Sequence, residues 1–256
     1  MPGIHDQMRT QLHDFLACPV CRGSLEPAGR DVRCVECGRS FAVRAGVPEL
    51  LVEPAPEQRP PGLTGRTLAA IVARPAVYDL VQNLAGAQRV FAQVRPMLGE
   101  MQGVVLDVGA GTGALQPVLP RGSEYVWLDS DRRKLQGFRA RSSSPAVLGD
   151  ATALPFRDEG VDWATCAFVL HHLEDVALAR LLDELRRVVR HGAFFIEPVP
   201  APTLRSRVLW RYDRGRFPRS ARELGQAVGE RFSLSEQREV AGLHRYFAVS
   251  AAKALP

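Results

Sequence analysis

LDVGAGTG, residues 106–113, decides the fold of this 256-residue chain. An apolar, strand-like segment leads into it, and glycines at 109, 111 and 113 let the backbone turn sharply and approach a ligand, since no Cβ stands in the way. We expect a helix to open directly after the turn. Gly109, Gly111 and Ala114 also satisfy the looser dinucleotide pattern, so a nicotinamide enzyme is an alternative at this point.

Strand-like and helix-like segments alternate on both sides of this turn. The candidate strands are VVLDV (104–108), EYVWLD (124–129), PAVLGD (145–150), DWATCAFV (162–169), AFFIE (193–197) and YFAVSA (246–251). Residues 174–189 place apolar side chains on one helical stripe, and Ser220 followed by Glu223 has capping-box spacing. The alternation predicts an α/β fold, a doubly wound and mostly parallel sheet.

Three carboxylates follow three consecutive candidate strands. Asp107 stands two residues before the first glycine, where an anion would repel a pyrophosphate but suits a cationic amino acid group. Asp129 can accept both hydroxyl hydrogens of a ribose, which a nicotinamide cofactor would also require. Asp150 can accept from an adenine amino group. Ligands of open parallel sheets bind at the carboxyl ends of the strands, where these three acids would lie. The negative charge of Asp107 at that edge favours a sulfonium cofactor.

Four of the five cysteines form two CxxC pairs, Cys18 with Cys21 and Cys34 with Cys37. Two tight turns that each present two thiolates match a tetrahedral zinc ion, and four protein ligands leave no open position, so the role would be structural. A redox dithiol needs only one pair. Two disulfides are disfavoured in a reducing compartment.

The Pro- and Gly-rich stretch EPAPEQRPPGLTG, residues 53–65, reads as a linker. We therefore expect a zinc-ribbon module at 1–52, a linker at 53–66 and the main domain at 67–256. No membrane-spanning run and no secretory signal are apparent, so we expect a cytoplasmic protein. The net charge of +5 favours acidic partners without identifying one.

LDVGAGTG, WLDSD, GDATALPF and DWATCAFVLHHLED, in this order, resemble the class I S-adenosylmethionine-dependent methyltransferases of type 11, from about residue 76 to residue 200. The resemblance implies a Rossmann-like methyltransferase fold and S-adenosylmethionine as cofactor. It assigns Asp107 to the methionine amino end, Gly109, Ala110, Gly111 and Gly113 to the carboxypropyl region, Asp129 and Ser130 to the ribose, and Asp150 and Ala151 to the adenine. Phe168 and His171 would lie beside the methionine part, and Tyr78 on a helix that closes over the cofactor.

Residues 14–52, with both cysteine pairs and GVPELL, resemble the small zinc-ribbon proteins that partner or fuse with methyltransferases acting on translation components. The overall layout also resembles large-subunit rRNA guanine methyltransferases with an N-terminal zinc ribbon. Those enzymes use a Cys and His variant of the metal site, and HHLED replaces their segment after the fourth strand.

A catalytic base is required only if the acceptor must lose a proton early. The candidates are His172, Glu174, Glu197 and His244, of which we select His172 and Glu197. The arginine-rich segment between Arg205 and Arg222 is either a solvated basic face or an anion site over the acceptor.

Two acceptor classes remain open on the sequence. A small molecule is favoured by the generic type 11 motifs, and no NPPY-type tetrapeptide marks an exocyclic-amine base methyltransferase. RNA is the alternative acceptor, and the zinc ribbon and the arginine-rich segment would then contact its phosphates. A binding module without turnover is a third interpretation, disfavoured by the intact motif set. The oligomeric state stays open.

Overall fold

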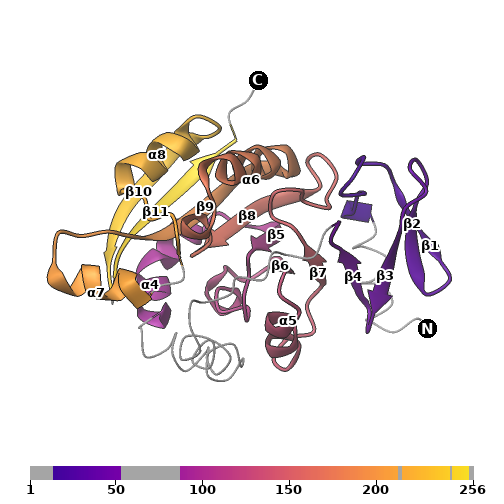
Figure 1. Cartoon of the computed structure of the whole chain (residues 1–256), viewed down its shortest axis with the longest axis horizontal. Helices are drawn as coiled ribbons and strands as arrows, with labels where there is room; N and C mark the ends of the chain where they lie inside the picture. Colours follow the sequence, from indigo (N-terminus) through magenta and orange to yellow (C-terminus); the bar gives the residue numbers. More distant parts are fainter. Residues whose placement is uncertain (1–13, 53–86, 213–214, 243, 254–256) are drawn as a thin grey trace.

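The computed structural model describes residues 14–52, 87–212, 215–242 and 244–253. Its main feature is one eleven-stranded sheet in the order β1-β2-β3-β4-β7-β6-β5-β8-β9-β11-β10 (Figure 1). The parallel centre of the sheet consists of β7 (Ala146–Gly149), β6 (Ser123–Asp129), β5 (Gly103–Val108), β8 (Val161–Ala167) and β9 (Val189–Val199). Five of the six candidate strands fall on these elements.

The sixth candidate strand lies in β11 (Arg245–Ala252), which runs antiparallel between β9 and β10 (Ser233–Ala241). The sequence pattern missed β10, because its side chains are mostly exposed and show no apolar alternation. The sheet is therefore mostly parallel, as predicted, with an antiparallel edge.

Alternate side chains of the central strands pack into two separate hydrophobic cores. Leu106 and Leu128 belong to one core, shared with α6 (Asp175–Val188) and α8 (Ala221–Gly229). Val105 and Trp127 belong to the other, shared with α4 (Ala87–Val94), η1 (Arg95–Leu98) and α5 (Arg132–Arg139). Because a strand points successive side chains to opposite faces, helices cover both faces of the sheet, and the doubly wound prediction is confirmed.

The helix expected after residue 113 is absent from the described structure. The chain there makes turns and a three-residue 3-10 helix, η2 (Gln116–Val118). Pro117 and Pro120 explain the difference, because each removes a backbone donor and resists a continuous α-helix. The helix over 174–189 and the capping box of Ser220 and Glu223 are both confirmed.

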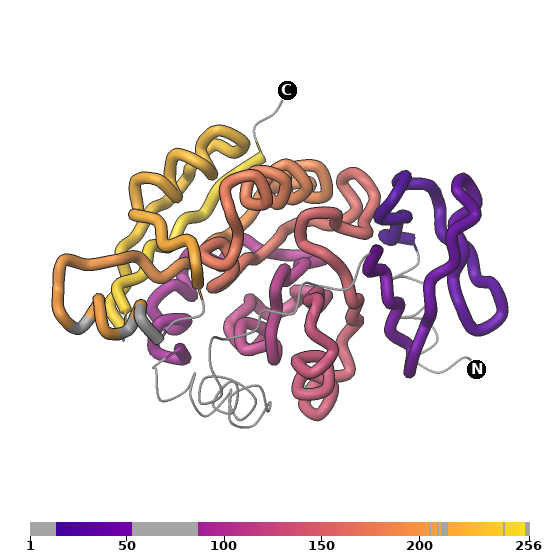
Figure 2. Tube along the Cα trace, viewed as in Figure 1, coloured from indigo at the N-terminus to yellow at the C-terminus, as the bar shows by residue number. Residues whose placement is uncertain are grey.

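The cysteine-bearing module consists of β1 (Leu25–Ala28), β2 (Asp31–Cys34), β3 (Ser40–Arg44) and β4 (Val47–Leu50). Strand β4 pairs in parallel with β7, through Glu49 with Leu148 and Leu50 with Gly149. In Figure 2 the indigo tube of this module lies at one end of the molecule, next to the rest of the chain. The module thus shares a sheet with the main domain, although the sequence suggested a separate unit; the predicted linker, 53–66, lies outside the described residues.

Two helices of the described residues remain, the short 3-10 helix η3 (Leu170–His172) after β8 and α7 (Leu204–Tyr212). Helix α7 lies at the end of the molecule opposite the ribbon (Figure 1). Within the described ranges, every helix is too short or too polar to cross a membrane.

Candidate cofactor site and metal centre

The glycine turn follows β5 and packs tightly against two other segments. Gly109 has φ +69°, and a Cβ there would lie 2.4 Å from Cγ2 of Val169, in the loop after β8. Gly113 has φ +79°, and its Cβ would lie 2.6 Å from Cδ2 of Phe138 on α5. Trp127 Nε1 donates to the carbonyl of Gly111 at 2.9 Å and fixes the middle of the turn. The positive φ and the close packing thus both require glycine at positions 109 and 113.

Asp107, Asp129 and Asp150 occur at the carboxyl ends of β5, β6 and β7, which are neighbours in the sheet. The structure therefore brings together the three acids that the sequence selected. Their environments differ, and each has its own set of partners.

Asp107 is fully enclosed, and both of its oxygens accept hydrogen bonds. Tyr125 donates its hydroxyl to Oδ2 at 2.6 Å, and Thr165 donates its own to Oδ1 at 2.8 Å. Burial raises the pKa of Asp107 from 3.8 to about 6 against the opposing effect of these two donors. Burial and the charge of Asp107 also raise the pKa of Tyr125, so its hydroxyl remains a donor. No sequence motif pointed to either of these two partners.

Asp129 is buried and ties the glycine turn to the next loop. Its Oδ2 accepts the Gly111 amide at 2.9 Å, its Oδ1 accepts the Asp131 amide at 2.9 Å, and Lys134 Nζ lies 3.5 Å from Oδ2. A carboxylate has about four acceptor positions, so further hydroxyl donors can still be accommodated. Ser130, the next residue, is exposed.

Asp150 is exposed and organises its own turn. Its Oδ1 accepts from the amide and the hydroxyl of Thr152, at 2.8 and 2.9 Å. Ala151 is half-buried. Ala110 lies in the glycine turn, where its amide donates to the carbonyl of Leu128 at 3.0 Å.

The loop after β8 begins with Phe168, a bulky residue at φ 61°. Its ring stacks on Phe91 of α4, with centroids 5.6 Å apart, and meets Tyr246 of β11 at 5.4 Å. Such a backbone conformation costs about 1 to 3 kcal/mol and persists only where the surroundings enforce it, as these rings do. Tyr78, the other aromatic residue assigned to the cofactor, lies outside the described residues.

Glu197 lies near the end of β9, is 2% exposed, and receives four donors from the same loop. Oε1 accepts the amides of Val169 at 2.6 Å and Leu170 at 2.8 Å. Oε2 lies 2.6 Å from Nδ1 of His171 and accepts its amide at 3.4 Å. A carboxylate with this many internal partners is poorly suited to take a proton from a substrate, and it holds the loop instead.

The other base candidates lie around the same loop. His172 is half-buried with its ring 4.1 Å from that of His171, and His244 contacts Trp210 and Tyr246, at 5.7 and 6.0 Å between centroids. Glu174 is exposed at the start of α6.

One arginine of the basic segment has a structural role that the sequence did not suggest. Arg219 is 9% exposed and donates to the carbonyls of Leu170 at 2.9 Å and Leu173 at 2.8 Å, and to Asp175 at 2.6 Å. Three other arginines of the segment are exposed: Arg207, Arg216 and Arg222. The side chains of Arg205, Arg211 and Arg214 lie outside the description.

The four predicted metal ligands form one cluster, with their sulfurs within 4.8 Å of one another. Cys18 and Cys37 lie 3.7 Å apart, and Cys21 and Cys34 lie 3.4 Å apart. Tetrahedral zinc with Zn–S distances of about 2.3 Å would separate its sulfurs by about 3.8 Å. The donor set and its spacing therefore fit a closed, four-thiolate zinc site.

The cysteine module contacts the loop that continues from Asp150. Leu16 and Phe156 form an antiparallel bridge, and the Ala17 amide donates to Pro155 O at 3.0 Å. Arg22, the residue after Cys21, donates to Glu184 of α6 at 3.1 Å.

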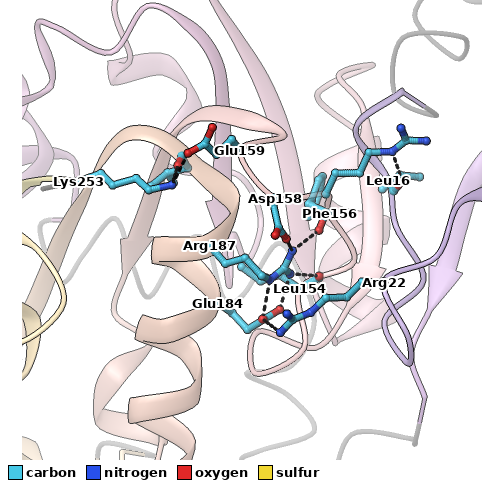
Figure 3. A network of polar contacts seen from close by, with 11 residues as sticks. Leu16, Arg22, Leu154, Phe156, Asp158, Glu159, Glu184, Arg187 and Lys253 are labelled. Carbon is cyan, nitrogen blue, oxygen red and sulfur yellow. Dashed lines mark hydrogen bonds and ion pairs between the residues drawn. The ribbon is translucent and has the colours of Figure 1, made fainter. Parts of the chain in front are cut away.

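Arg187 completes this contact network, as Figure 3 shows. It donates to Glu184 at 2.6 and 2.8 Å, to the carbonyls of Leu154 and Phe156 at 2.9 and 2.7 Å, and to Asp158 at 2.9 Å. Both the cysteine module and the Arg187 guanidinium thus form hydrogen bonds with the backbone of the loop after β7.

Two family models match the chain. Residues 106–196 match the methyltransferase domain model Methyltransf_11, and residues 9–46 match the Trm112p-like protein model.

The chain is similar over part of its length to curated methyltransferases. It is 40% identical over 90 residues to a demethylmenaquinone methyltransferase of Renibacterium salmoninarum, covering 34% of this chain and 37% of that protein. It is 36% identical over 135 residues to a ubiquinone/menaquinone biosynthesis C-methyltransferase of Burkholderia mallei, covering 45% and 52%. The chain thus spans about half or less of the length of these relatives.

Solved structures share the fold at low sequence identity. A chain from a complex containing the Haloferax volcanii Trm112 methyltransferase activator aligns with TM-score 0.58 and 16% identity, covering 72% of this chain and 99% of that chain. The magnesium protoporphyrin IX methyltransferase of Synechocystis, with bound SAH, aligns with TM-score 0.57 and 17% identity, covering 74% and 100%.

Proposed function

Because the chain carries a class I methyltransferase domain behind a Trm112p-like module, we propose that it transfers a methyl group from S-adenosylmethionine to a small-molecule acceptor. One observation carries the proposal: three acids lie at the ends of the adjacent strands β5, β6 and β7, and the glycine turn that follows β5 packs on the loop after β8. This anionic edge suits a cationic cofactor and disfavours a diphosphate.

We assign the cofactor contacts along this edge of the sheet. Asp107 faces the amino end of the methionine part, Asp129 with Ser130 the ribose, and Asp150 with Ala151 the adenine. The turn from Gly109 to Gly113, with Ala110 and Gly111, takes the carboxypropyl part. Phe168, His171 and Tyr78 complete the set. The positions of the described residues along one edge of the sheet support these roles. The role of Tyr78 rests on the family resemblance alone.

When bound, S-adenosylmethionine would supply an electrophilic methyl group on its sulfonium. The protein's contribution is mainly to hold the acceptor atom about 3 to 3.5 Å from that carbon. The loop 168–173, fixed by Glu197 and Arg219, is the part of the described chain best placed to do so.

The relatives support a small, ring-containing acceptor, because their names specify demethylmenaquinone and ubiquinone or menaquinone biosynthesis. The aromatic rings that gather beside loop 168–173 suit such a molecule. They belong to Phe91, Phe168, Trp210 and Tyr246.

We further propose that Cys18, Cys21, Cys34 and Cys37 hold a structural zinc ion. With all four positions taken by thiolates, the metal serves folding and no substrate binds to it. The contacts of the module with the loop after β7 and with α6 support a bracing role for it.

The test is incubation of the purified full chain with radiolabelled S-adenosylmethionine and a fractionated extract. We expect label in organic-extractable small molecules, and much less label with Asp129→Ala at a donor concentration near the wild-type Kd. Label in RNA would replace the small-molecule acceptor by a nucleic acid. Failure of calorimetry to detect S-adenosylmethionine binding, with nicotinamide dinucleotide bound instead, would refute the proposal.

A further inference from the structure

Helix α7 is held to the protein through one face and leaves apolar side chains on the other. Leu204 and Val208 are 69% and 48% exposed, and their spacing of four residues places them on one side of the helix. On the opposite side Ser206 is 8% exposed, and the Trp210 ring lies 5.9 Å from the ring of His171. The exposed pair is therefore presented outward by a helix whose inner face is packed.

Phe217 adds a third exposed apolar side chain beside the same loop, 168–173. It is 36% exposed, yet its amide donates to the carbonyl of His171 at 3.0 Å and its carbonyl accepts from Arg219 at 3.4 Å. Three of the seven large apolar residues that are exposed in the described structure thus lie between residues 204 and 217. Exposed apolar side chains that gather in this way mark a binding surface more often than scattered ones do.

The same segment carries positive charge that the described structure leaves exposed. Residues 205–222 include seven arginines and one acidic residue. Arg219 is used inside the protein, in the contacts with loop 168–173 given above. Arg207 and Arg216 are exposed, and neither forms an ion pair with another described residue. Arg207 stands three residues after Leu204 on α7, so a guanidinium and an apolar side chain share one face of the helix.

We propose that Leu204, Arg207, Val208, Arg216 and Phe217 form a docking surface for an anionic lipid bilayer, and we call it the α7 surface. Arginine is attracted to negatively charged headgroups, and its long side chain can reach them while its neighbours lie deeper. The apolar side chains then leave water for the boundary between headgroups and acyl chains. One partner thus accommodates both the charge and the apolar area of this surface.

The exposed aliphatic side chains favour a bilayer over a nucleic acid. RNA would attract the arginines equally well through its phosphates. Its further contacts are made by stacking of bases on aromatic rings and by hydrogen bonds to base edges, in which Leu204 and Val208 cannot take part. A bilayer is the partner that gives these two side chains an apolar environment.

The α7 surface adjoins the loop that the proposed function places beside the acceptor. Trp210 of α7 and Phe217 both contact His171 of loop 168–173. An apolar acceptor dissolved in the bilayer would therefore reach the enzyme close to where it is used. This consequence rests on the proposed function, whereas docking on the bilayer does not.

The experiment is co-sedimentation of the full chain with unilamellar vesicles, in the absence of S-adenosylmethionine and acceptor. One set of vesicles is pure phosphatidylcholine, and the other contains about 30% phosphatidylglycerol to supply negative charge. We expect binding to the anionic vesicles to be about tenfold tighter or more than binding to the neutral ones. It should weaken when the salt concentration rises from about 0.05 M to about 0.3 M, because salt screens the arginines.

Two substitutions separate the charged from the apolar contribution. Arg207→Gln should weaken binding to the anionic vesicles about fivefold, the contribution of one basic residue near such a surface. Leu204→Gln should weaken it about tenfold, because a large apolar side chain no longer enters the bilayer. The matched controls are Arg30→Gln and Val52→Gln, at exposed positions of the cysteine module at the other end of the molecule (Figure 1), and they should leave binding unchanged.

Urea unfolding and RNA binding complete the test. Leu204→Gln should keep the urea midpoint of the wild type, since the side chain is exposed; a lower midpoint would show that the protein itself covers this face and would overturn the inference. Absence of binding to the anionic vesicles, an equal loss in the controls, or unchanged vesicle binding of Leu204→Gln would overturn it as well. Binding of a labelled single-stranded RNA without binding to vesicles would assign the α7 surface to a nucleic acid instead. None of these measurements depends on methyl transfer, so failure of the inference and failure of the proposed function are distinguishable.

Discussion

Replacement of Asp107 by Asn should make the protein more stable at neutral pH and less able to bind S-adenosylmethionine. The carboxylate is buried between Tyr125 and Thr165, and its pKa rises from 3.8 to about 6. Each pKa unit corresponds to about 1.4 kcal/mol, so the folded state keeps this charge at a cost of roughly 3 kcal/mol above pH 6.

The pH dependence has a definite sign. Because the folded-state pKa is raised, the cost is present above pH 6 and disappears as the pH falls to about 4. The neutral amide of Asp107→Asn avoids this cost at every pH. One of the two hydroxyl donors must then turn to accept from the amide NH2 group, which costs about 1 kcal/mol.

The variant should consequently be about 1 kcal/mol less stable than the wild type near pH 4 and about 2 kcal/mol more stable near pH 7.5. Urea unfolding of both proteins at several pH values measures the difference, in which other titrating groups cancel. Asp150→Asn, at an exposed carboxylate, is the matched control and should show no such crossover. Parallel pH profiles for Asp107→Asn and the wild type would refute the assigned cost of burying the charge.

Further predictions concern the cofactor site, the metal centre and the contact between the two parts of the chain. Asp129→Ala should lower affinity for S-adenosylmethionine by about tenfold or more, because a ribose would lose a charged acceptor; unchanged affinity by calorimetry would remove Asp129 from the site. Cys34→Ser should lose the metal and unfold the ribbon, as measured by metal content and circular dichroism, and retention of a full zinc equivalent would show the ligand set to be wrong. Arg187→Met should destabilise the fold by about 3 to 5 kcal/mol, because Glu184 keeps a buried charge, whereas Arg22→Ala should cost about 1 kcal/mol or less, since Arg22 is 63% exposed. Equal costs in urea unfolding would contradict this ranking.

Features of the chain that depend on local spacing were predictable from the sequence. Apolar segments alternating with amphipathic ones identified the central strands and α6, and the capping box at Ser220 located the start of α8. The glycine turn, the three acids at strand ends and the CxxC pairs could be recognised because each is a short motif whose chemistry is carried by a few adjacent residues. The same local reasoning predicted a helix after Gly113, which Pro117 and Pro120 prevent.

Only the tertiary structure decided the contacts between distant segments, because no local sequence pattern encodes their energies. Thr165 and Asp107 are 58 residues apart in the sequence, yet they form a hydrogen bond because β5 and β8 are neighbours in the sheet. Burial of Asp107 in this sheet raises the pKa of its carboxyl group. Glu197 looked like a possible base at a strand end, yet the fold of the loop after β8 directs three amides and a ring nitrogen onto it. The ribbon looked like a separate module, but the exposed edge of β7 offers backbone hydrogen bonds that β4 satisfies, so one sheet runs through both parts.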